Sequence, residues 1–123
     1  MYALLSATDD AHEQARDTFV RLLGEDERLV SHNYVLVETS ALVQHRLGIE
    51  ALRTLRDDLL AVVALEWVDR GLHERALAAT LTGARRDVSL VDHVSFELMR
   101  RLGIRHAFAF DEDFAREGFS TVP

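Results

Sequence analysis

The chain has 123 residues, 48% of them hydrophobic and 28% charged, and 21 acids against 14 bases give it a net charge of −7. This length suits one domain that can bury a core without disulfides or a structural metal. No apolar run approaches the roughly 20 residues of a membrane-spanning helix, nor the apolar stretch of an export signal. We therefore expect a cytoplasmic protein that does not contact the membrane.

The residue types narrow the chemistry further. The sequence has no cysteine, which excludes disulfide frameworks, thiol catalysis and cysteine-ligated zinc or iron–sulfur sites. All 14 bases are arginine. A broad basic surface for nucleic acid is therefore absent, and any RNA contact must use local arginine clusters. The acidic balance suits the binding of divalent cations.

Strand and helix patterns alternate in the first half of the chain. The spacing of apolar residues predicts a helix over 9–24, a short strand over 28–31 and a third element, a helix, over 33–47. The apolar positions expected to mark the buried side of this last helix are Tyr34, Val35, Val37, Ala41 and Leu42. Gly48 predicts its end, and a further helix is expected over 49–60.

The second half continues the alternation. A β-branched and aromatic run predicts a strand over 62–68, and Asp69 is expected to cap a helix that ends at Gly83. A capping-box pattern at Ser89 predicts a helix closed by Gly103. Strands are expected over 106–110 and 119–122. The expected buried positions of the two helices are Leu72, Ala76, Ala79 and Leu81, and Val91, Val94, Leu98 and Leu102.

This alternation predicts one α/β domain over residues 1–123, with a mainly parallel sheet covered by helices on both faces. We expect five aromatic side chains to belong to the core and not to a base-stacking surface. They are Phe19, Trp67, Phe96, Phe108 and Phe110.

Three acids are candidates for a site: two follow predicted strands, where ligands collect in such sheets, and the third, Asp92, opens a helix. Glu38 lies on the apolar side of its helix, although a lone glutamate there could reach water along its own stem. Asp92 is the third residue of a capping box, which by itself explains an acid. Asp111 ends the strand over 106–110, and it could equally cap the next turn. Asp113 could share either role.

Together these acids require three separate loops to end in carboxylates on one side of a sheet, which favours a shared site. Clustered carboxylates repel one another unless a cation compensates. Oxygen ligands without cysteine suit Mg²⁺ or Mn²⁺. Such an ion supports hydrolysis of a phosphodiester.

The segments 31–41, 89–103, 107–111 and 117–119 resemble PIN-domain proteins, and among them the VapC-type ribonuclease toxins of bacterial toxin–antitoxin pairs. The resemblance covers essentially the whole chain. The Ser-x-x-Asp helix start at Ser89 and the Phe-Asp-x-x-Phe run from Phe110 carry it most specifically. It implies a three-layer PIN fold.

By this resemblance Glu38, Asp92 and Asp111 match three of the family's four acidic metal-site positions, whereas Asp113 matches none clearly. The resemblance implies an endoribonuclease that depends on Mg²⁺ or Mn²⁺ and cleaves structured RNA such as tRNA or rRNA. It also implies inhibition by a cognate antitoxin and a homodimer.

One departure concerns the start of the chain. PIN proteins open with an apolar strand ending in Asp, ahead of the stretch that here reads Tyr2-Ala-Leu-Leu5. We expect this strand and the fourth acid to be missing, through a late start codon, a trimmed chain or a decayed gene. Folding and metal binding would then be impaired.

Two alternatives remain open. A PIN-like module that has lost catalysis could act only through protein–protein binding. A phosphoacceptor signalling domain shares the α/β order, but it needs a lysine that this chain lacks.

Two further groups of residues stand near the candidate site. Arg85 and Arg86 are candidates for steering RNA toward it, whereas Arg100, Arg101 and Arg105 suit a salt-bridged surface. His32 and His93 are expected on the surface or in a supporting role.

Overall fold

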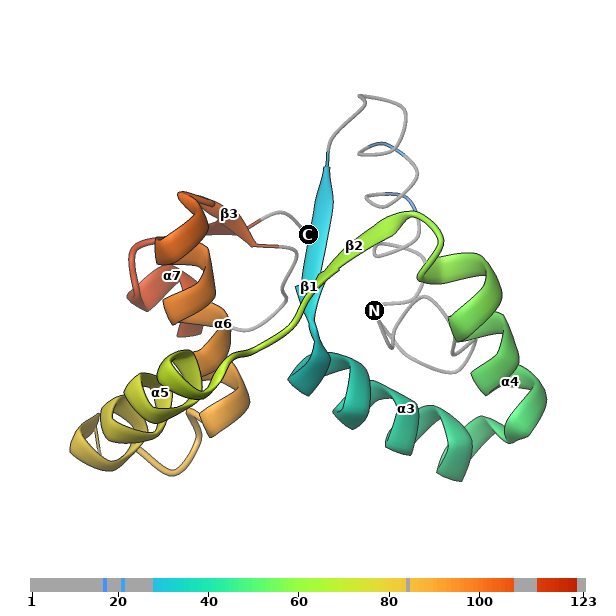
Figure 1. Ribbon diagram of the computed structural model, residues 1–123, viewed down its shortest axis with the longest axis horizontal. Helices are drawn as coiled ribbons and strands as arrows, with labels where there is room; N and C mark the ends of the chain where they lie inside the picture. Colours follow the sequence, from blue (N-terminus) through green and yellow to red (C-terminus); the bar gives the residue numbers. More distant parts are fainter. Residues whose placement is uncertain (1–16, 18–20, 22–27, 84, 108–112, 122–123) are drawn as a thin grey trace. The chain divides into compact units, whose positions relative to one another are not determined.

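The computed structural model describes residues 17, 21, 28–83, 85–107 and 113–121. The chain divides into two compact units, Met1–Trp67 and Val68–Pro123, and each is described by itself (Figure 1). Of the predicted helix over 9–24, only residues 17 and 21 are described, and both are helical. Phe19, Phe108, Phe110 and Asp111 lie outside the described residues.

The first unit is built on a parallel strand pair. Strand β1 (Leu29–His32) pairs with β2 (Val63–Glu66), with Leu29 opposite Val63 and His32 opposite Glu66. The connection runs through helices α3 (Asn33–Leu47) and α4 (Ile49–Thr54) and a π-helical turn, η1 (Leu55–Leu59). Figure 1 shows α3 leaving the end of β1 and α4 returning toward β2. A helical crossover of this kind is what a parallel pair requires.

Helix α3 has the boundaries that its sequence predicts. It begins after His32, whose ring accepts a hydrogen bond from the Val35 N–H at 3.4 Å. It ends at Gly48, whose φ of 92° turns the chain while its N–H donates to the carbonyls of Val43 and Gln44. The positive φ suits glycine because glycine lacks a Cβ.

The expected buried side of α3 is wrong. Val37 is 66% exposed, and Leu42 is also exposed. The buried residues are Thr39 and Val43, while Leu36 and Ser40 line a groove against α4. These four positions have the helical spacing of one face. A threonine and a serine occupy half of this face, so the pattern of apolar residues predicted a different face as the buried one.

The second unit packs two helices against each other around a small core. Helix α5 (Arg70–Gly83) lies against α6 (Leu90–Leu102), as Figure 1 shows. Strand β3 (His106–Ala107) pairs in parallel with β4 (Ser120–Thr121), and α7 (Asp113–Arg116) precedes β4. The most buried side chains of this unit are Leu72, Ala76, Val94 and Phe96.

Asp69 ties the start of α5 to the end of α6. Its Oδ1 accepts from the Leu72 N–H at 2.8 Å, which confirms the predicted cap, and its Oδ2 accepts from Arg101 at 2.9 Å. The hydrogen bond from Arg101, followed by that from Leu72, holds the pKa of Asp69 below its usual range. The two helices of the unit are thus joined by a polar contact as well as by their apolar sides.

Besides those of α3, three predicted core positions are exposed. Leu81 is 73% exposed because it lies about half a turn away from the Leu72 side of α5. Leu102 is 43% exposed in the last turn of α6. Trp67 is 71% exposed. The β1–β2 ladder ends at the pair His32–Glu66, because β1 is followed by α3 from Asn33. Trp67 comes directly after this last pair and therefore has no residue of β1 opposite it.

Both strand pairs are parallel and both alternate with helices, as the sequence predicts for an α/β domain. Phe96 is buried as expected. Within the part of the chain that is described, no helix has the length and apolar character needed to span a bilayer.

The two leucines of α5 give a matched test of this packing. Leu72 is 1% exposed and Leu81 is 73% exposed. We expect Leu72→Ala to lower the free energy of unfolding by about 2–5 kcal/mol, because it leaves a cavity in the core. Leu81→Ala should change it by less than about 0.5 kcal/mol. Urea unfolding followed by circular dichroism measures both, and equal losses would contradict this arrangement of α5.

Candidate metal centre

Glu38 lies in the middle of α3, in the first unit, and is exposed. Its neighbours on the outward side of the helix, Val37 and Leu42, are exposed apolar residues. Among the described residues, no hydrogen bond or ion pair engages the Glu38 carboxylate. The carboxylate is therefore accessible, and its place is set by the backbone of α3.

His32 closes the start of the same helix from within the unit. The residue is only 3% exposed, so of the two expected placements, the surface or a supporting role, the surface is excluded. Nδ1 accepts from the Val35 N–H, and the ring lies edge-on to Tyr34 with centroids 6.1 Å apart. Burial lowers the pKa of His32 from 6.5 to about 4. The imidazole is therefore neutral at pH 7 and can accept a hydrogen bond.

Asp92 opens α6 in the second unit and is half-buried. The predicted capping box is confirmed: Ser89 Oγ accepts from the Asp92 N–H at 3.2 Å, and Asp92 Oδ2 accepts from the Ser89 N–H at 2.9 Å. No described residue bonds to Oδ1. Capping uses one carboxylate oxygen and leaves the other able to bind a ligand, so the two interpretations of Asp92 are compatible.

An aromatic cluster holds the segment after Asp111 against α6. The ring of Phe96, one turn beyond Asp92, contacts Phe114 edge-on at 5.0 Å and stacks on Phe119 at 6.0 Å. His93 also lies edge-on to Phe96, at 5.6 Å, so this histidine has a packing contact. These contacts fix the start of α7 beside the helix that carries Asp92.

Three further candidates from the sequence are Asp113, Arg85 and Arg86. Asp113, the first residue of α7, accepts from Arg116 at 3.1 Å. Arg85 pairs with Asp87 at 2.8 Å. Arg86 is exposed, and it forms no ion pair with the residues that the structure describes.

The predicted salt-bridged surface at the far end of α6 is confirmed for two arginines. Arg100 donates to Glu117 at 2.6 Å and Arg101 to Asp69 at 2.9 Å.

The meeting of the three predicted carboxylates stays a prediction. Glu38 belongs to the first unit and Asp92 to the second, and Asp111 is outside the described residues. Over the described ranges, no three or more His, Asp or Glu side chains gather in a way that could hold a metal ion.

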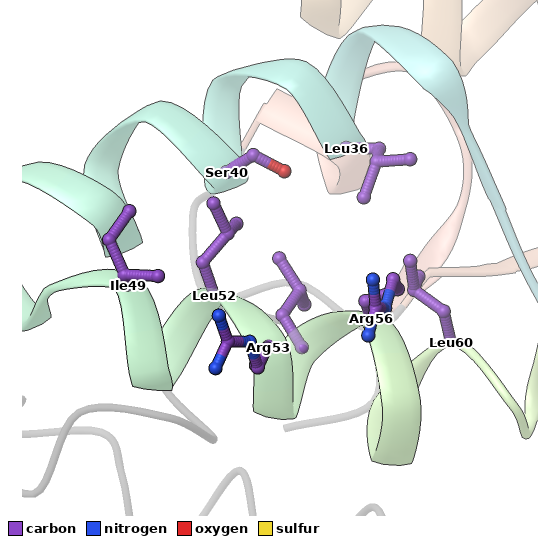
Figure 2. Close-up of a pocket in the computed structure, with 8 residues that line it drawn as sticks. Leu36, Ser40, Ile49, Leu52, Arg53, Arg56 and Leu60 are labelled. Atoms are coloured by element: carbon purple, nitrogen blue, oxygen red, sulfur yellow. The ribbon is translucent and has the colours of Figure 1, made fainter.

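The first unit also has an apolar groove that the sequence did not indicate. It has a volume of about 400 Å³ and lies between α3 and the α4–η1 segment. Figure 2 shows Leu36 and Ser40 on one side and Leu52 on the other, with Arg53 and Arg56 at its edge. Both arginines are paired, with Glu50 and Asp57 respectively. On α3 the sequence signal for this groove is the i, i+4 spacing of Leu36 and Ser40, and the serine makes it hard to recognise as apolar.

Comparisons with known proteins decide the family. The model of the PIN domain family matches residues 1–119. The chain belongs to the PIN domain family. It is 35% identical over 121 residues to the 23S rRNA-specific endonuclease VapC20 of two Mycobacterium tuberculosis strains, covering 98% of this chain and 90% of that protein.

The crystal structure of Mycobacterium tuberculosis VapC20, described as a Sarcin-Ricin loop cleaving toxin, superposes with a TM-score of 0.80. The superposition covers 96% of this chain and 89% of that one at 36% identity. The α/β PIN fold and the resemblance to VapC-type toxins are therefore confirmed. The expectation of a single domain over residues 1–123 stays a prediction.

The buried cap predicts a pH dependence of stability. The pKa of His32 is about 4 in the folded chain and 6.5 when unfolded, so the unfolded chain binds the proton more readily. The contribution of neutral His32 is complete above pH 6.5 and is lost as the pH falls from 6.5 to 4. We expect this loss to reach up to about 3 kcal/mol. Urea unfolding at half-unit pH steps, with His32→Asn as control, measures it, and identical curves for both proteins would contradict it.

Proposed function

We propose that this PIN-domain chain is a divalent-metal-dependent endoribonuclease toxin that cleaves structured RNA. The observation that carries the proposal is the similarity to a 23S rRNA-specific endonuclease along 98% of the chain. Ribosomal RNA is accordingly the favoured substrate class, with tRNA as the second. Because these RNAs are accessible in the cytoplasm, we propose that the enzyme acts there.

Glu38, Asp92 and Asp111 are the proposed metal ligands. Carboxylate oxygens are the donors that Mg²⁺ and Mn²⁺ prefer, and the chain offers no thiolate. The accessible carboxylate of Glu38 and the free Oδ1 of Asp92 fit this role, as the hydrogen bonds of the described residues leave both available. When bound, the ion would lower the pKa of a water molecule and offset negative charge on the phosphate.

Two features support bringing Asp92 and Asp111 into one site. Asp92 is fixed at the start of α6 by its capping box. Phe114, three residues after Asp111 along the chain, packs on Phe96 one turn beyond Asp92. Helix α6 therefore both carries Asp92 and holds the segment that follows Asp111 along the chain.

The protein's own residues would bind and orient the RNA. Arg85 and Arg86 precede α6, whose first turn carries Asp92. Their guanidinium groups can donate paired hydrogen bonds to phosphates. Arg86 is the better placed of the two because Arg85 already pairs with Asp87. In this proposal the arginines bind and orient the RNA backbone, and the carboxylates hold the metal ion at the phosphate to be cleaved.

The proposed partners are a cognate antitoxin and a second copy of the chain. The groove between α3 and the α4–η1 segment offers an apolar floor with arginines at its edge, which suits an amphipathic segment of an antitoxin. The exposed apolar residues of α3, such as Val37, add surface that a partner would cover.

Substitution of the proposed ligands tests the enzyme. We expect Glu38→Ala, Asp92→Asn and Asp111→Asn each to lower Mg²⁺- or Mn²⁺-dependent cleavage of rRNA by on the order of 100-fold or more, because each removes a ligand charge. Glu74→Ala is the matched control, since Glu74 is an exposed acid paired only with Arg70. Cleavage of rRNA is measured with the full-length protein and each full-length variant, and addition of EDTA gives the metal-free reference.

If the three ligand variants and the parent cleave RNA equally, or none cleaves, the nuclease proposal is wrong for this chain. Antitoxin binding that survives such a result would instead favour the PIN-like module that acts only through protein–protein contacts.

Arg86 gives an independent test of RNA binding. We expect Arg86→Gln to raise the KM for rRNA roughly twofold to fivefold and to reduce its salt dependence, with kcat unchanged. Arg70→Gln is the control because Arg70 is exposed but pairs with Glu74 on its own helix. A KM that Arg86→Gln does not change would exclude this arginine from the RNA contact.

A further inference from the structure

His32 stands at the junction between β1 and α3 and belongs to both elements. The residue is the last of β1 and lies opposite Glu66 in the parallel ladder. It is also the residue whose side chain accepts from the Val35 N–H at the start of α3. One buried residue thus both pairs in the sheet and caps the helix. It therefore fixes the direction of α3 relative to the β1–β2 pair.

This cap works only with a neutral ring. Nδ1 needs its lone pair to accept from the Val35 N–H, so the ring proton lies on Nε2. Protonation of Nδ1 would replace the acceptor with a donor facing the backbone N–H groups. It would also place a positive charge at the positive end of the helix dipole. A buried environment opposes this by disfavouring the charged form.

The charged and titratable groups on the adjoining elements are few among the described residues. On β2, Glu66 is the register partner of His32, and its carboxylate lies 4.0 Å from the guanidinium of Arg28. On α3 itself the ring of Tyr34 lies edge-on to that of His32. The charge of Glu66 is therefore shared with an arginine.

Glu38 depends on this junction because no described residue bonds to its carboxylate. It lies six residues after His32, about one and two-thirds turns along α3. A change in the direction or the first turn of α3 would move the Glu38 carboxylate with the helix. A displacement of about 1 Å is enough to weaken a site that requires defined ligand positions.

We propose that His32 is a positioning residue of the metal centre: its neutral imidazole fixes the start of α3 and thereby the position from which Glu38 reaches the metal ion. This inference rests on the proposed function, since it takes Glu38 to be a ligand. It assigns His32 no contact with metal or RNA.

Four variants test the proposal. His32→Ala removes the cap, His32→Gln keeps a polar side chain that caps poorly, and His32→Asn supplies a strong cap without the imidazole. His45→Ala is the control, because His45 lies exposed in the last turn of the same helix. The measurements are the Kd for Mn²⁺ by calorimetry at pH 7.5, kcat and KM on rRNA, and hydrogen exchange of the Val35 amide.

We expect His32→Ala and His32→Gln to weaken Mn²⁺ binding by on the order of tenfold, with a lower kcat and faster exchange at Val35. His32→Asn should restore all three to within about threefold of the parent, and His45→Ala should change none of them. If His32→Ala does not fold, the comparison of His32→Gln with His32→Asn decides the matter.

Equal impairment of His32→Asn and His32→Gln overturns the proposal, because capping would then not be the cause. Unchanged Mn²⁺ binding in His32→Ala also overturns it. A parent chain that binds no Mn²⁺ refutes the proposed function and the positioning role together. Failure of the proposed function can be told apart from failure of the positioning role alone, because in the second case the parent binds Mn²⁺. Exchange at Val35 shows in either case whether His32 caps α3.

Discussion

The N–H groups at the start of α3 and α6 constrain the positions of two of the three candidate ligands. The first N–H groups of a helix have no partner within it, and those that are buried need an acceptor from elsewhere. In α3 the acceptor is the buried ring of His32, and in α6 it is the hydroxyl of Ser89. Glu38 and Asp92 follow within these two helices. Glu38 and Asp92 thus take their positions from a cap at the start of the helix that carries each of them.

The two caps leave the acids in different states. Asp92 is itself part of its capping box, so one oxygen is held by the backbone of Ser89 and the side chain has little freedom. Glu38 lies in the middle of its helix and is held only through the backbone. A metal site made from both would combine one rigid and one adaptable carboxylate, which suits ions that retain several water ligands.

Much of the local structure could be predicted because it depends on residues close together in the chain. The boundaries of α3, the Asp69 cap of α5 and the capping box of α6 all follow from side-chain acceptors and glycines within four residues. The candidate ligands came from the same patterns joined to the PIN resemblance, which the comparisons confirm at the level of the family. Whether the three acids meet depends on contacts between distant segments, and so no local pattern establishes it.

The sequence by itself determined the boundaries of α3, the caps of α5 and α6, the parallel α/β order and the resemblance to the family, because these follow from local hydrogen bonding, periodicity and motif spacing. Only the tertiary structure decided which side of α3 is buried, that Trp67 is exposed and that His32 is enclosed. These outcomes depend on partners far along the chain: α4 covers the Leu36 side of α3, and the end of the β1–β2 ladder leaves Trp67 unpaired. Burial is a property of the packed elements together, which the order of residues within one element does not contain.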